Sequence, residues 1–172
     1  ISTENNIPRK EFGNYIGTDE AQRNYIIKVL VANQQNAISQ YYSFVLGDSK
    51  TYAEATDPYQ LMGMYQKLEG VGPYGSSGLY GQQYNNEGIA HKTCSDLLRF
   101  YRYDAALSTA LNLPALVGGG AFRDSIGNTV FVLWAKTTID KSEVATAVYS
   151  FPTNLGIAPL LYKRDWNYSV TG

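Results

Sequence analysis

The sequence predicts an α/β portion followed by an all-β portion. A strand end, a long amphipathic helix and an aromatic strand succeed one another before residue 47. That order is typical of a parallel sheet with a right-handed crossover. From about residue 113, apolar and polar residues alternate with a period of two, which is typical of antiparallel strands. We therefore predict two domains, residues 1–112 and 113–172.

The opening residues predict the end of a buried strand followed by a polar loop. Glu4 lies where the strand ends, and Pro8 cannot continue a central strand because it has no N–H for the ladder. A carboxylate at the end of a parallel strand, with a helix after it, is how a (β/α)8 barrel presents a catalytic acid. The sequence starts within this strand, so we expect a fragment or processed product of something larger.

The next elements are a helix and a second strand. Thr18 is the expected N-cap, and Asp19 and Glu20 complement the helix dipole in the first turn of a helix of about five turns. Residues 40–46 are aromatic and β-branched and end at Gly47, so they are predicted to form a strand. The three elements predict a βαβ unit.

A polar loop, a short element and a Gly/Tyr-rich loop should follow. Residues 47–60 hold Asp48 with other charged residues, and a solvated loop is their default interpretation. Residues 60–68 fit either a short strand or one helical turn. Residues 70–86 contain five glycines and three tyrosines, a composition typical of functional or mobile loops.

A second helix is predicted from about residue 86 to residue 103. Cys94 lies on its apolar stripe and is most simply a small buried side chain. His91 lies off the centre of that stripe, which favours a partly exposed, hydrogen-bonded residue over a ligand or a base. Each is the single residue of its type, so an intrachain disulfide and a zinc site built on cysteines or on several histidines are excluded.

The C-terminal part should contain four strands of a sandwich. Residues 121–136 predict a hairpin with a glycine-containing turn at residues 125–128. Residues 144–151 and 160–168 predict two further strands. A four-stranded sheet with one apolar face needs a second layer, which either the α/β part or further strands would supply.

Composition excludes several classes of function. The chain has 172 residues, 44% of them hydrophobic, and 14 basic against 15 acidic residues give a net charge of −1. This balance provides no electrostatic footprint for nucleic acid or for an anionic membrane. No apolar run approaches the roughly 20 residues of a spanning helix. Fifteen tyrosines suit a sugar-binding surface, and equally a tyrosine-rich extracellular β-protein without a ligand.

Ser2-Thr3-Glu4-Asn5, the βαβ unit and the C-terminal strand pattern together resemble the C-terminal part of a retaining glycoside hydrolase. That clan combines a (β/α)8 barrel with an appended β-sandwich, as in the cell-surface glycosidase-like proteins of gliding, polymer-degrading bacteria. The resemblance implies an incomplete barrel (its last two βα units) plus a partial antiparallel β-sandwich. It implies an extracellular or cell-surface location and a polysaccharide or oligosaccharide substrate, with neither metal nor cofactor.

The resemblance also implies roles for individual residues. Glu4 would be the catalytic nucleophile, and Asn5, Tyr42 and Asp48 would bind substrate. The acid/base glutamate of the clan lies on barrel strand four, outside this chain, so the isolated chain is expected to be inactive.

Other interpretations stay open. Glu4 could instead bond loop amides or pair with Arg9 or Lys10, and Tyr42 and Trp134 fit packing better than sugar stacking. The protein could be a non-enzymatic surface, filament or glycan-binding protein that uses a glycosidase-like scaffold. A third alternative is a complete chain that buries its open edges against copies of itself.

Overall fold

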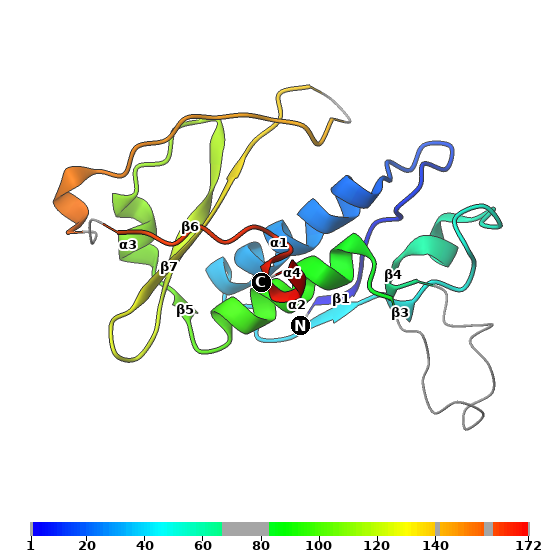
Figure 1. Ribbon diagram of the computed structural model, residues 1–172, viewed down its shortest axis with the longest axis horizontal. Helices are drawn as coiled ribbons and strands as arrows, with labels where there is room; N and C mark the ends of the chain where they lie inside the picture. Colours follow the sequence, from blue (N-terminus) through cyan, green and yellow to red (C-terminus); the bar gives the residue numbers. More distant parts are fainter. Residues whose placement is uncertain (1, 67–82, 140–141, 157–159, 172) are drawn as a thin grey trace.

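The computed structural model describes residues 2–66, 83–139, 142–156 and 160–171. These residues form a mixed α/β fold, in which two parallel strand pairs and a three-stranded antiparallel sheet accompany two long helices. Figure 1 shows these helices side by side, with the antiparallel sheet at one end of the pair and one parallel strand pair at the other. The strands described here form no closed barrel.

The predicted βαβ unit is confirmed. Strand β1 (Ser2–Asn5) leads to helix α1 (Asp19–Gln35) and then to strand β2 (Tyr41–Ser43), which pairs with β1 in parallel. The Thr18 hydroxyl accepts a hydrogen bond of 3.0 Å from the backbone N–H of Ala21, so the predicted N-cap is also confirmed.

The predicted strand at residues 40–46 is interrupted at Phe44. Strand β2 ends at Ser43, and β3 (Val45–Gly47) pairs in parallel with β4 (Gly63–Tyr65). The Phe44 ring packs on Tyr59, with the two ring centroids 5.5 Å apart. Tyr59 belongs to the 3-10 helix η1 (Pro58–Leu61). The sequence leaves a short strand or a helical turn open for residues 60–68, and the structure contains both, the end of η1 and strand β4. Most of the Gly/Tyr-rich loop lies outside the described residues.

The second predicted helix ends earlier than expected. Helix α2 comprises Asn86–Leu98, and the chain then forms β5 (Arg102–Tyr103) and α3 (Ala105–Ala110). The Tyr103 N–H donates to Gln34 Oε1 at 3.0 Å, and β5 pairs with β6. Tertiary pairing therefore overrides the helical pattern here. The antiparallel sheet thus begins at β5, before residue 113, although the sequence pattern changes to alternation only at about residue 113.

The predicted hairpin is confirmed and carries the main core. Strands β6 (Val117–Arg123) and β7 (Thr129–Ala135) pair antiparallel along their whole length. Phe122 of β6 packs with Val31 of α1 and Leu98 of α2, and all three are buried. Tyr103, Val130, Val132 and Trp134 are among the half-buried side chains around this cluster. The C-terminal parts of both helices thus pack against the sheet.

The two further strands predicted at residues 144–151 and 160–168 are wrong. Neither segment joins a ladder, and the chain continues into the short helices η2 (Thr153–Leu155) and α4 (Tyr168–Thr171). The alternation in residues 144–151 is nevertheless real, because Val148 is 88% exposed while Phe151 packs 5.0 Å from Phe131, between ring centroids. The Tyr149 hydroxyl also donates to the Leu111 carbonyl at 2.6 Å. The segment is anchored by its side chains rather than by backbone pairing.

Candidate functional site at the strand ends

A buried polar network joins the chain just after β1, β3 and η1 to the start of α2. Its members are an arginine, two carboxylates and three side-chain amides, mostly buried: Asn6, Arg9, Gln22, Asp48, Asn85 and Glu87. In the parallel pair β3–β4, as in β1–β2, the carboxyl end of a strand is where an α/β fold places its functional side chains. The network is therefore the candidate site.

Asp48 is the anionic centre of this network. It is 4% exposed, and its carboxylate accepts hydrogen bonds from Arg9 Nε at 2.8 Å, the Gly63 N–H at 2.9 Å and Asn85 Nδ2 at 3.1 Å. Burial raises the pKa of Asp48, and these bonds together with the Arg9 charge oppose that rise. The guanidinium of Arg9 also faces Asp19 at 3.5 Å. The Arg9–Asp48 ion pair joins the loop after β1 to the end of β3.

Glu87 lies in the first turn of α2 and has no exposed surface. Its Oε2 accepts a hydrogen bond of 3.0 Å from Asn6 Nδ2, whereas Oε1 has no partner among the described residues. Burial raises the pKa of Glu87 to about 8, and the Asp48 charge acts in the same direction. Glu87 is therefore mostly a neutral carboxylic acid at pH 7. Burial raises the pKa of the nearby hydroxyls of Tyr25 and Tyr41, and a negative charge on Glu87 acts in the same direction.

The network closes around three consecutive backbone carbonyls. Gln22 Nε2 donates to the Leu61 carbonyl at 3.2 Å, Asn6 Nδ2 donates to the Met62 carbonyl, and Asn85 Nδ2 donates to the Gly63 carbonyl at 2.7 Å. Since buried carbonyls need partners, these amides fix the chain between η1 and β4. Gly63 is required there, because a Cβ would lie 2.3 Å from the Asp48 nitrogen.

The structure places the predicted site residues in three different settings. Glu4 and Asn5 lie in β1, with Asn5 opposite Ser43 of β2, and their side chains are outside the described residues. Tyr42 is 52% exposed and lies on the open side of β2. Asp48 is buried against protein groups. Asn6, which directly follows Asn5, belongs to the network and attaches the loop after Glu4 to it.

Sequence reasoning missed Asn6, Gln22, Asn85 and Glu87. Asn85 and Glu87 have the composition of a helix start, where polar residues are ordinary. The available signal was Glu87 three residues before the apolar Ala90 on the inward side of α2. That signal is weak, because a first-turn glutamate normally faces water.

The two single residues of α2 take no part in this network. Burial lowers the pKa of His91 and raises the pKa of the Cys94 thiol to about 11. The thiol is therefore protonated at neutral pH and is a poor nucleophile. Among the described residues, histidines, cysteines and carboxylates form no group of three suited to a metal ion.

Comparison of the chain with protein-family models, with curated proteins and with solved structures gave no match. Function is therefore inferred from the residues and from their geometry. In the described part of the chain, no helix combines the length and apolar character needed to cross a membrane.

Proposed function

We propose that this chain is the C-terminal part of a secreted glycoside hydrolase-like protein that cleaves polysaccharides with retention. Glu4 is its nucleophile. The observation that carries the proposal is the parallel β1–α1–β2 unit, in which Glu4 is the penultimate residue of β1 and the buried network begins two residues later. The resemblance of the Thr3-Glu4-Asn5 strand end to retaining glycosidases supports the same role.

In this proposal, β1 and β2 belong to the last two βα units of a (β/α)8 barrel. Helix α1 follows β1 directly, and α2 follows β2 after β3, η1 and β4, in the places of the outer helices of a barrel. The remaining strands come from residues ahead of Ile1. The antiparallel sheet of β5, β6 and β7 begins the appended β-domain.

The chemistry is a double displacement. The Glu4 carboxylate attacks the anomeric carbon and forms a glycosyl ester, while a second carboxyl group protonates the leaving oxygen. That group then removes a proton from the water that releases the sugar. Retaining enzymes hold the two carboxyl groups about 5–5.5 Å apart. We assign the second group to the preceding part of the polypeptide.

Glu87 and Asp48 are supports rather than the acid/base in this scheme. Glu87 is 0% exposed and Asp48 is 4% exposed, so neither meets a bound sugar in this arrangement. Both hold the loop after β1, Glu87 through Asn6 and Asp48 through Arg9. Asn5 and the exposed Tyr42 are the substrate contacts of the proposal.

The direct test is Glu4→Gln in the full-length polypeptide. We expect kcat to fall by about three orders of magnitude or more, because removing a covalent nucleophile removes several kcal/mol of barrier lowering. Affinity for the polysaccharide should persist. Glu11→Gln, at an exposed loop position, is the control and should leave kcat within about twofold. Unchanged hydrolysis by the Glu4→Gln variant rules out this assignment.

A non-enzymatic glycan-binding or surface protein is the second candidate. The exposed Tyr42 favours it, since this residue is 52% exposed and such rings suit saccharides. The denatured intact mass of the native material separates the cases at the first step. The hydrolase proposal requires a mass well above 19.0 kDa, whereas a mass near this value excludes the missing barrel strands.

A further inference from the structure

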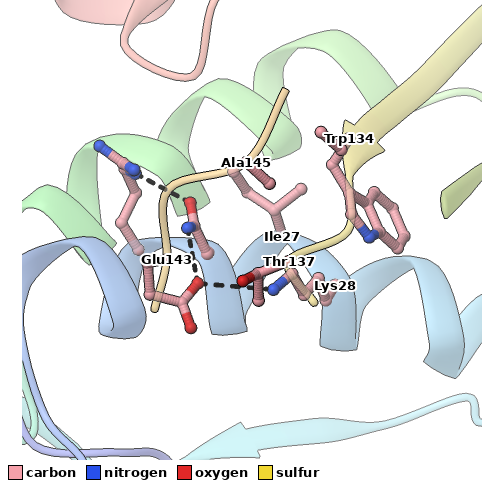
Figure 2. Close-up of a pocket in the computed structure, with 9 residues that line it drawn as sticks. Ile27, Lys28, Trp134, Thr137, Glu143 and Ala145 are labelled. Atoms are coloured by element: carbon pink, nitrogen blue, oxygen red, sulfur yellow. Dashed lines mark hydrogen bonds and ion pairs between the residues drawn. The ribbon is translucent and has the colours of Figure 1, made fainter. Parts of the chain in front are cut away.

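A hollow lies between α1 and the chain that follows β7, apart from the strand-end network. Its volume is about 180 Å³. Figure 2 shows α1 contributing Ile27 and Lys28, the end of β7 contributing Trp134, and the following segment contributing Thr137, Glu143 and Ala145. All of these residues belong to the described part of the chain.

The apolar wall of the hollow is Trp134, and its ring position is fixed by Gly118. The two residues are opposite each other in the β6–β7 ladder. A Cβ on Gly118 would lie 2.4 Å from Trp134 Nε1 and 2.6 Å from Cε2, so only glycine lets the indole lie against β6. Ile27 and Ala145 extend this apolar surface. The hollow therefore has a rigid aromatic side.

The polar wall centres on Glu143. Its Oε2 accepts a hydrogen bond of 2.8 Å from Asn24 Nδ2 and pairs with Lys28 Nζ at 3.6 Å. Arg23 Nε in turn donates to Asn24 Oδ1 at 3.1 Å. Figure 2 shows that both interactions of Glu143 end on one oxygen. Among the described residues, none donates a hydrogen bond to the other oxygen, which can therefore accept one from a ligand. The Lys28 side chain is 40% exposed and keeps further donor capacity.

A ligand for this hollow must have an apolar flat face and groups that both donate and accept hydrogen bonds. The flat face packs on the indole, and the hydrogen-bonding groups pair with the carboxylate and the ammonium beside it. A purely apolar ligand would leave Glu143 and Lys28 without their water. A neutral sugar ring meets all these requirements, and β-linked sugars with equatorial hydroxyls present the flattest C–H face.

We propose that this hollow binds one neutral sugar unit of a β-linked polysaccharide, with the ring on Trp134 and its hydroxyls bonded to Glu143 and Lys28. The site is built without Glu4, so it does not rest on the hydrolytic proposal. It gives the protein a way to hold a polysaccharide away from the strand ends.

The test is a fluorine NMR titration of the full-length protein labelled with 5-fluorotryptophan, using cellotetraose as the probe. The Trp134 signal is assigned by its loss in Trp134→Phe. We expect a saturable shift of that signal, and the same shift in Glu4→Gln, since the hollow does not involve Glu4. This second result separates failure of the site from failure of the hydrolytic assignment.

Two variants of the polar wall make the test specific. Glu143→Gln and Lys28→Met should each weaken cellotetraose binding by about tenfold, the effect of losing one hydrogen bond to a charged group. Lys92→Met is the matched control, because the Lys92 side chain is also 40% exposed and ion-paired, on α2, and it should leave affinity unchanged. Absence of a Trp134 shift with cellotetraose overturns the proposal. A response to α-linked maltotetraose alone, or equal weakening by Lys92→Met, overturns it as well.

Discussion

Asn6 Nδ2 donates a hydrogen bond of 3.0 Å to Glu87 Oε2 and thereby joins the loop after β1 to the first turn of α2. Glu87 has no exposed surface, and Asn6 stands two residues after Glu4. The contact links residues 81 positions apart in the sequence. The position of the loop after the proposed nucleophile therefore depends on the charge state and packing of a helix residue.

The stability of the protein should fall between about pH 4.5 and pH 8 through Glu87. Its pKa rises from 4.5 in the unfolded chain to about 8 in the fold, so the folded state binds the proton more tightly. The contribution of Glu87 is then complete below pH 4.5 and is lost as the pH rises through the folded pKa. The loss is on the order of 5 kcal/mol, from about 1.4 kcal/mol per pKa unit over the rise from 4.5 to about 8.

Urea unfolding of wild type and Glu87→Gln at pH 5, 7 and 9 measures this effect. The amide cannot ionise, so the free energy of unfolding of the variant should exceed that of wild type increasingly as the pH rises. Three other titratable groups lie close to Glu87 in space: Tyr25, Tyr41 and Asp48. Taking the difference in the free energy of unfolding between the two proteins cancels most of their contribution. Parallel pH profiles would show that Glu87 is not a buried acid.

Asp48→Asn should destabilise the protein by about 2–4 kcal/mol, because it leaves the Arg9 guanidinium without its buried counter-charge. The Arg9 side chain is 12% exposed, so water replaces the lost partner poorly. The control is Asp96→Asn at the exposed Lys92–Asp96 pair, which should leave the free energy of unfolding close to that of wild type, because exposed ion pairs contribute little. Equal effects in urea unfolding would mean that the Asp48 pair is no stronger than a surface pair.

Gly63→Ala should destabilise the β3–β4 pair by about 1–3 kcal/mol. The added Cβ meets backbone atoms of Gly47 at 2.4 Å, and backbone cannot rotate away as a side chain can. Gly13→Asn is the control: Gly13 has φ of +56° and open space around it, and asparagine tolerates that conformation. A Gly63→Ala protein with wild-type thermal stability would contradict the close approach.

Backbone amides of residues 144–150 should exchange with deuterium much faster than those of β6 and β7. Residues 144–150 make no ladder, and Val144 and Val148 are 81% and 88% exposed, whereas β6 and β7 pair along their whole length. Hydrogen-exchange mass spectrometry compares the two segments in one sample. Equal protection would show that the segment joins a sheet, as its sequence pattern suggests.

Local signals allowed several elements to be predicted from the sequence. Thr18 and the two acidic residues after it define the start of α1, and a glycine-containing turn defines the β6–β7 hairpin. The alternation in residues 144–151 correctly predicts which side chains turn inward. It could not predict backbone pairing, because pairing depends on whether a neighbouring strand edge lies within reach.

The candidate site was predictable only in part. The sequence located Glu4 and Asp48 at strand ends, since those positions follow directly from the βαβ order. It did not identify Glu87, because a glutamate in a first helical turn normally faces water and only tertiary packing buries this one. The Trp134 hollow depends on Gly118, sixteen positions earlier in the hairpin, and no local pattern joins the two.

Covalent trapping tests the assignment of Glu4 most directly. The full-length protein is incubated with an activated 2-deoxy-2-fluoroglycoside, which slows release of the glycosyl ester, then digested with trypsin and analysed by mass spectrometry. We expect a single sugar adduct on the peptide that ends at Arg9, located on Glu4 and absent from Glu4→Gln. An active protein that carries the adduct on any other carboxylate would contradict this assignment.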